Sequence, residues 1–168
     1  MDYQDINAET ISKWIKDGWA WGIPIDSETY QKALSGQWDV KLTPKENVPH
    51  SWFGDLKGKR LLGLASGGGQ QIPIFSALGA ECSVLDYNDM QLESERIVSK
   101  REGYKVDIVK ADMSKPLPFS NACFDIIFCP PSLCYIEKVE PLLKEWARIL
   151  KDNGTLMITF ENGINYIT

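Results

Sequence analysis

A glycine-rich turn constrains the fold of this chain more than any other feature. The residues Arg60-Leu-Leu-Gly-Leu-Ala-Ser-Gly-Gly-Gly-Gln-Gln71 read as a short buried strand that runs into a turn, with an apolar helix behind it. Glycines suit such a turn because its backbone takes dihedrals that a Cβ forbids and because a ligand can approach the main chain closely. The N–H groups that open the next helix then face that ligand. The turn therefore predicts a ligand-binding strand–turn–helix unit.

An acidic residue follows this turn at an informative distance. Asp86 ends the next predicted strand, Glu81-Cys-Ser-Val-Leu-Asp86. In nucleotide-binding α/β folds, a carboxylate about 20 positions after the turn binds the ribose hydroxyls. The structural alternative for Asp86 is a carboxylate that only stabilises a turn at the strand end. Together the two features predict a site for an adenosine-containing cofactor.

Strands and helices alternate after the turn, which predicts a doubly wound, mainly parallel α/β sheet with helices on both faces. Near-continuous apolar runs are typical of strands covered on both faces. Asn88 with Gln91 resembles a capping box for the second helix. The expected strands span residues 60–65, 81–86, 105–110, 124–129 and 155–161, and the expected helices span 69–78, 89–102 and 140–150.

Residues 1–50 are predicted to form a separate helical segment, and residues 51–168 a Rossmann-like core. Asn7 is the expected N-cap of a helix over residues 8–17, and Asp26 or Ser27 that of a second helix ending near Gly36. Five of the six tryptophans lie ahead of the glycine turn. They suit either a layer packed onto the core by aromatic surface or a lid over the ligand pocket.

The composition of the chain limits the kinds of binding partner that we expect. The formal charge of −5 over 168 residues, without a local run of Lys and Arg, argues against nucleic acid. No apolar run reaches the ~20 residues that span a bilayer, and the N-terminus does not resemble a signal peptide. The four cysteines lack C-x-x-C spacing, so we expect buried thiols of a cytoplasmic protein and no metal site.

The glycine pattern also discriminates between cofactors. A nicotinamide-binding site is typically marked by G-x-G-x-x-G, but counting from Gly67 puts Ile72 at the third glycine position. No Lys follows the glycines, so the phosphate-binding G-x-x-x-x-G-K-[S/T] motif is absent. If the nicotinamide pattern G-x-G-x-x-G is instead counted from Gly63, the match is incomplete and its first glycine lies inside the predicted strand.

From Lys57 to Asn162 the chain resembles class I S-adenosylmethionine-dependent methyltransferases. The resemblance rests on an ordered set of segments, which is more specific than any one of them. These are Leu61-Leu-Gly-Leu-Ala-Ser-Gly-Gly-Gly69, Val84-Leu-Asp-Tyr-Asn88, Lys110-Ala-Asp-Met113 with Leu117-Pro-Phe119, and Phe124-Asp-Ile-Ile-Phe128 followed by a helix that ends in Arg148-Ile-Leu-Lys-Asp-Asn-Gly154.

The resemblance implies strand order 3-2-1-4-5, S-adenosylmethionine as cofactor, and a set of contact residues. Asp86 would accept hydrogen bonds from the ribose hydroxyls, Tyr87 would lie against the adenine, and Asp112 would accept from its amino group. A turn cap is the structural alternative for Asp112. The full implied set is Ala65, Ser66, Gly67, Gly69, Gln70, Asp86, Tyr87, Asn88, Asp112, Met113 and Cys129.

The chain departs from the family pattern in three places. Gly63 stands where an acid is usual, Ala65 replaces the first turn glycine, and the loop Cys129-Pro-Pro-Ser132 only partly matches the N-P-P-Y loop of amino-group methyltransferases. The family's sheet has seven strands, whereas this sequence accommodates five. An open fifth strand would favour a homodimer through that edge or a C-terminally truncated core.

We therefore expect methyl transfer to a small-molecule acceptor by in-line displacement. The alternatives are a non-catalytic S-adenosylmethionine-binding or regulatory domain and a nicotinamide-dependent Rossmann enzyme. No catalytic base is selected. The only histidine, His50, lies in a linker, and the spacing of Tyr30 and Tyr135 does not single them out.

Overall fold

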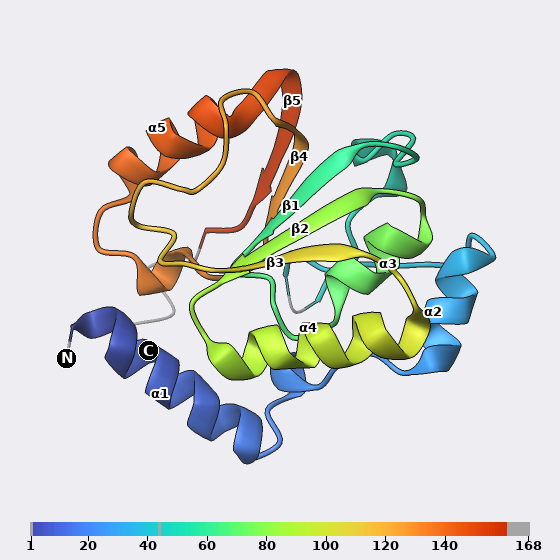
Figure 1. The fold of residues 1–168 in the computed structure, drawn as a ribbon, viewed down its shortest axis with the longest axis horizontal. Helices are drawn as coiled ribbons and strands as arrows, with labels where there is room; N and C mark the ends of the chain where they lie inside the picture. Colours follow the sequence, from blue (N-terminus) through green and yellow to red (C-terminus); the bar gives the residue numbers. More distant parts are fainter. Residues whose placement is uncertain (1, 44, 161–168) are drawn as a thin grey trace.

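The computed structural model describes residues 2–43 and 45–160 as one sheet with helices on both faces (Figure 1). All four strand pairings are parallel, and the order is β3-β2-β1-β4-β5, as predicted. The strands are β1 (Arg60–Leu64), β2 (Glu81–Asp86), β3 (Val106–Lys110), β4 (Phe124–Cys129) and β5 (Leu150–Ile158). The helices are α1 (Tyr3–Lys16), α2 (Ser27–Leu34), α3 (Gln71–Ala77), α4 (Asp89–Glu102) and α5 (Val139–Ile149), with 3-10 turns η1 (Ala20–Gly22), η2 (His50–Trp52) and η3 (Leu133–Tyr135).

Two apolar clusters cover the two faces of the sheet. On one face α2 and α3 contribute Ala33, Ile72 and Phe75 to a core that includes Leu61 and Val84 of the strands. On the opposite face α5 packs Leu142, Trp146 and Ile149 against β4 and β1 (Figure 1). Val40, Leu42 and Val48 also join the first cluster. Part of the predicted N-terminal segment is thus continuous with the core, while the predicted boundary at residue 50 stays a prediction.

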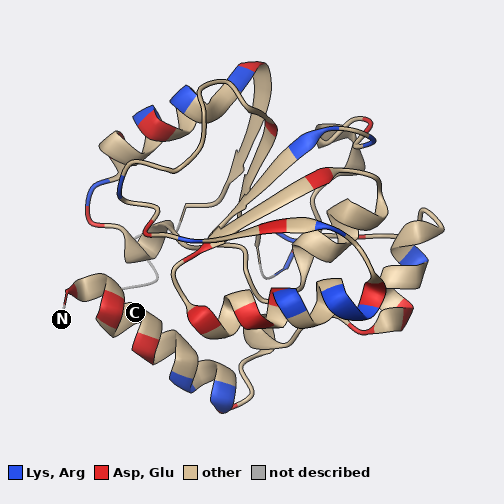
Figure 2. Ribbon diagram, viewed as in Figure 1, with Lys and Arg blue, Asp and Glu red and all other residues tan. Residues whose placement is uncertain are grey.

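Helix α1 begins earlier than predicted. Its N-cap is Asp2, which accepts from the N–H groups of Gln4 and Asp5 while the Asp5 side chain bonds back to Asp2 in a capping box. Asn7, the expected cap, instead lies inside the helix. The first half of α1 is acidic and its last turn carries Lys13 and Lys16 (Figure 2), an order that complements the helix dipole.

Strand β5 also begins earlier, at Leu150 rather than residue 155. The Asp152-Asn-Gly154 sequence, typical of a turn, had placed the expected strand start after it. It is instead an irregularity inside the strand, because Leu150 pairs with Phe124 and Thr155 pairs with Ile126. Asn153 takes a left-handed φ of 61°, which asparagine tolerates well. The predicted end at residue 161 lies outside the described residues. β5 forms one edge of the described sheet, and the homodimer through that edge stays a prediction.

Other expectations are confirmed with small changes. Asp26 caps α2, and α4 ends at the predicted residue 102, followed by Gly103 in a left-handed conformation. Asn88 caps α4, but Gln91 does not close the predicted capping box, because its Nε2 faces the carbonyl of Trp21 at 3.5 Å. Cys82, Cys123 and Cys129 are buried, whereas Cys134 is exposed, contrary to the expectation of four buried thiols. Within the described ranges, no helix is long and apolar enough to cross a bilayer.

Candidate cofactor site

The glycine turn leaves β1 at the carboxyl end of the sheet and bends toward β2. Ala65 opens it with a left-handed φ of 46° and donates its N–H to the carbonyl of Leu85 at 2.8 Å. Gly67 follows, and its N–H donates to Asp86 Oδ2 at 3.1 Å. A Cβ on Gly67 would lie 2.8 Å from Gln91 Cβ and 3.0 Å from that carboxylate oxygen. Glycine is therefore required here by close packing between the turn and the end of β2.

Asp86 is held by the backbone on both sides. Oδ1 accepts from the N–H of Asn88 at 2.9 Å, and Oδ2 accepts from Gly67. Burial raises the pKa of Asp86, and these backbone N–H groups partly offset the rise. Each carboxylate oxygen has a second lone pair, so both can still accept a hydroxyl hydrogen from a ligand. The fixed carboxylate suits a ribose diol.

Two adjoining cavities lie beyond the carboxyl ends of the strands, where ligands bind in open α/β sheets. The β2–β3 cavity, of about 60 Å³, lies between the ends of β2 and β3 and is lined in part by Asp86, Tyr87, Asp112 and Met113. The β1–β4 cavity, of about 240 Å³, lies between the ends of β1 and β4 and is lined in part by residues 65–67. Ala65 and Tyr135 line both cavities, so the two form adjoining halves of one site.

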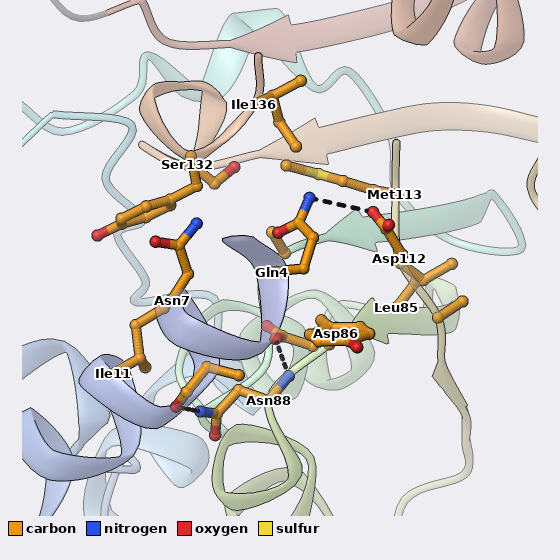
Figure 3. Close-up of a pocket in the computed structure, with 15 residues that line it drawn as sticks. Gln4, Asn7, Ile11, Leu85, Asp86, Asn88, Asp112, Met113, Ser132 and Ile136 are labelled. Carbon is orange, nitrogen blue, oxygen red and sulfur yellow. Dashed lines mark hydrogen bonds between the residues drawn. The ribbon is translucent and has the colours of Figure 1, made fainter. Parts of the chain in front are cut away.

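Helix α1 roofs the β2–β3 cavity, as Figure 3 shows. Gln4 is only 7% exposed and donates from Nε2 to Asp112 Oδ1 at 3.2 Å. Asp112 Oδ1 also accepts from the N–H and the hydroxyl of Ser114. No hydrogen bond to Asp112 Oδ2 is formed within the described residues, which leaves that oxygen as an acceptor for a ligand amino group.

Two further residues predicted at the site bind α1. The Tyr87 hydroxyl donates to Asp5 at 2.8 Å, and this bond is the main reason that the pKa of Tyr87 rises to about 12. Asn88 Nδ2 donates to the carbonyl of Ala8 and the hydroxyl of Ser12, each at 2.8 Å. Tyr87 and Asn88 both line the β2–β3 cavity, yet the polar atoms of their side chains form hydrogen bonds to α1. Through them the end of β2 positions α1 over the cavity.

A strap formed by residues 19–25 closes the β1–β4 cavity. Gln70 Nε2 donates to the carbonyls of Ala20 at 2.9 Å and Ile23 at 2.6 Å, and the N–H of Ile25 donates to the carbonyl of Gly69 at 2.9 Å. Trp19 and Trp21 thereby line the cavity opposite the glycine turn. The Gln70 side chain lines the cavity, but its amide N–H groups donate hydrogen bonds to the strap.

Two of the predicted contact residues lie behind the cavity walls. Gly69 lines neither cavity, because its N–H faces Glu95 and its Cα packs against Val98 and Pro24. Cys129 is fully buried with Sγ 3.1 Å from Ser132 Oγ, and burial raises its pKa to about 12. Ala65, Ser66, Gly67, Gln70, Asp86, Tyr87, Asn88, Asp112 and Met113 all line one or both cavities.

The roof and part of the wall were not predicted from the sequence. Gln4, Asn7 and Ile11 follow a helical spacing along α1 that also fits an ordinary packing face, so no local signal marked them. Gln91 was expected only as a cap residue. Its Oε1 is buried without a hydrogen-bond partner in the described part of the chain, and it lies beside Gly68. Oε1 is closed to solvent in this conformation, so a movement of the Gln91 side chain would be needed to present this unsatisfied acceptor to a ligand ammonium group.

The fold and this site define the class I S-adenosylmethionine-dependent methyltransferases. The family model described as a methyltransferase domain matches residues 62–158, and the chain belongs to this family. It is 36% identical over 161 residues to the uncharacterized methyltransferase YbaJ of Bacillus subtilis, covering 96% of this chain and 63% of YbaJ. The chain thus spans less than two thirds of that relative's length.

Solved structures share the fold. The YcgJ protein of Bacillus subtilis superposes with a TM-score of 0.60 at 19% identity, covering 84% of this chain and 55% of YcgJ. An S-adenosylmethionine-dependent methyltransferase from Mesorhizobium loti gives a TM-score of 0.55 at 24% identity, with 62% of this chain and 47% of that chain covered. These similarities establish the architecture, and the site's own chemistry supports the cofactor.

Proposed function

We propose that this chain binds S-adenosylmethionine across the two adjoining cavities and transfers its methyl group to a small, uncharged acceptor. One observation carries the proposal. Asp86, Asp112 and the glycine turn lie around one site at the carboxyl ends of β1, β2 and β3, although they are far apart in the sequence. Such a set can accept hydrogen bonds from a ribose and from an adenine amino group at the same time.

Different parts of the cofactor would lie in the two cavities. Asp86 would hold the ribose, and Asp112 Oδ2 with the Met113 backbone would hold the adenine beneath α1. The turn and, after movement of its side chain, the acceptor Gln91 Oε1 would hold the amino-acid end in the β1–β4 cavity. When bound, S-adenosylmethionine supplies a methyl group on an already activated sulfonium. The chain would then contribute alignment of the acceptor and exclusion of water, for which the α1 roof and the strap are suitably placed.

The lining of the β1–β4 cavity supports an uncharged acceptor. Trp19, Trp21 and Tyr135 present aromatic surface, Pro130 and Pro131 add apolar surface, and none of the described lining residues is charged. An ionised acceptor would lose its hydration there without a charged side chain in the described lining to offset that loss, which leaves only the charges of the cofactor itself. Aromatic walls favour a flat or largely apolar molecule.

Calorimetric titration with S-adenosylmethionine tests the cofactor proposal, with NAD as the competing cofactor. We expect binding to the unmodified chain and a loss of about 10- to 100-fold in affinity for Asp86→Asn, which removes a charged acceptor. Asp107→Asn changes an exposed carboxylate on β3 and is the matched control. Binding of NAD in place of S-adenosylmethionine would contradict the proposal.

A panel of small acceptors, assayed by release of S-adenosylhomocysteine, tests the transfer itself. We expect turnover with uncharged aromatic acceptors, reduced by Trp21→Ala at the cavity wall and unchanged by Trp52→Ala, whose side chain is 58% exposed. Cofactor binding without turnover of any acceptor would instead support the non-catalytic binding domain.

A further inference from the structure

A buried carboxylate lies behind the glycine turn, outside both cavities. Glu95 of α4 is 0% exposed. Its Oε2 accepts from the N–H of Gly69 at 3.1 Å, and its Oε1 accepts from the Tyr104 hydroxyl at 2.7 Å. The carboxylate therefore connects the turn after β1 to the loop before β3 through the middle of α4.

The contact with Gly69 controls how closely the turn approaches α4. Gly69 has a left-handed φ of 66°, and a Cβ there would lie 2.7 Å from Val98 Cγ2 and 3.0 Å from the carbonyl oxygen of Ser94. The turn thus lies directly on the α4 backbone. β1 itself, with the sequence Arg-Leu-Leu-Gly-Leu, offers no carboxylate to the turn. Glu95 is the side chain that bonds the Gly69 N–H, and Gly69 lies two residues after Gly67 and three after Ser66, both of which line the cavity.

We infer that Glu95 is a positioning residue whose ionised carboxylate holds the glycine turn in the shape that binds the cofactor. This inference rests on the proposed function, because the turn is a wall of the proposed site. A hydrogen bond to an ionised acceptor is roughly twice as strong as one to a neutral acceptor. Protonation of Glu95 therefore loosens the turn and weakens cofactor binding.

Of the titratable groups in this buried cluster, Glu95 is the one with a pKa in the neutral range. Burial raises its pKa to about 7, against the lowering effect of the Tyr104 and Gly69 hydrogen bonds. The titratable groups that interact with it are Tyr104 and, on β2, Cys82. Tyr30 on α2 lies behind Tyr104, on which its ring stacks with centroids 5.6 Å apart. Burial raises the pKa of all three, so they stay uncharged near pH 7.

The ligand-free chain provides a direct test. The amide resonances of Gly69 should shift with pH in a nuclear magnetic resonance titration, with a midpoint near 7 set by the pKa of Glu95. Glu95→Gln should abolish that titration. Glu93→Gln, which changes an exposed carboxylate on the same helix, should leave it intact. A Gly69 amide that does not titrate between pH 5.5 and 8.5, a range of about 1.5 units around that midpoint, would overturn the inference.

Cofactor affinity provides the second readout. We expect the Kd for S-adenosylmethionine to rise about three- to ten-fold between pH 8 and pH 6 in the unmodified chain and in Glu93→Gln. Glu95→Gln should bind about three- to ten-fold more weakly at pH 8, with a smaller change between the two pH values. The change that is left would come from Asp86, whose pKa is also raised by burial. An unchanged pH profile in Glu95→Gln would overturn the inference while leaving the proposed function standing. Failure of the unmodified chain to bind at any pH would overturn both.

Discussion

Gln4 and Asp112 are hydrogen-bonded across 108 positions of sequence, from Gln4 Nε2 to Asp112 Oδ1 at 3.2 Å (Figure 3). The bond joins the first turn of α1 to the loop after β3 and closes the side of the β2–β3 cavity that α1 lines. It also fixes which carboxylate oxygen of Asp112 remains for a ligand. The N-terminal helix is thereby part of the site.

Removing this bond should weaken the cofactor complex. In Gln4→Ala the roof loses its link to Asp112, at a cost of about 0.5–1.5 kcal/mol, so the Kd for S-adenosylmethionine should rise about two- to ten-fold. Calorimetry measures the change, and Gln31→Ala on the exposed side of α2 is the matched control. Equal affinities for both variants would show that α1 does not contribute to binding.

Filling the glycine turn should destabilise the chain and block the site. In Gly67→Ala the new methyl group meets Gln91 and the Asp86 carboxylate, an overpacking that costs about 1–3 kcal/mol of unfolding free energy. Gly36→Ala meets only open space, at a left-handed φ of 85°, so it is destabilised by backbone strain far from the cavities. Gly67 is not left-handed, so its loss comes from overpacking, and Gly36→Ala serves as a comparison for a destabilised chain with an unaltered site. Thermal unfolding should show loss of stability in both variants, and only Gly67→Ala should lose cofactor affinity.

The free energy of unfolding should fall as the pH rises, because Glu95 ionises less readily while it is buried in the folded chain. Its pKa is raised from the ordinary glutamate value of 4.5 to about 7, so the folded chain holds this proton where the unfolded chain has released it. The free energy of unfolding should therefore fall between about pH 4.5 and 7, by an upper limit of about 3 kcal/mol from this group. Glu95→Gln should reduce that fall.

Urea unfolding at pH 5 and pH 8 measures the effect on both chains. Relative to the unmodified chain, Glu95→Gln should be more stable at pH 8 than at pH 5, even though it binds cofactor more weakly. A residue that only supported the fold would lose stability and affinity together. The same pH dependence of stability in both chains would contradict the prediction.

Cysteine alkylation should report occupancy of the β1–β4 cavity. Cys134 is exposed and lines that cavity, whereas Cys129 is buried with its pKa raised to about 12. Since the thiolate is the nucleophile, Cys134 should react with iodoacetamide first. S-adenosylmethionine should slow its alkylation several-fold, as followed by mass spectrometry. Faster labelling of Cys129 than of Cys134 would contradict the described burial.

The local sequence was sufficient to predict the core of the fold. Glycine placement, continuous apolar runs and helix-ending residues predicted β1 to β4, α3 and α4 to within two residues at each end, because those signals act within a few positions of the chain. The spacing of Asp86 from the turn predicted that both belong to one ligand site, and the structure places them side by side through the Gly67–Asp86 hydrogen bond, which was not itself predicted. The two boundaries missed by the most, those of α1 and β5, had competing local signals: a second possible cap at Asn7 and a turn sequence at 152–154.

Only the tertiary structure determined how the site is enclosed. The Gln4–Asp112 bond, the Gln70 contacts with the strap and the Glu95–Gly69 bond join residues 26 to 108 positions apart. Gln4, Gln70 and Glu95 sit in segments that also read as ordinary amphipathic or capping sequence, because a polar residue's partner depends on which elements pack together. The sequence by itself therefore determined the sheet and the carboxylate at its edge, whereas packing determined which side chains roof, close and support the cofactor site.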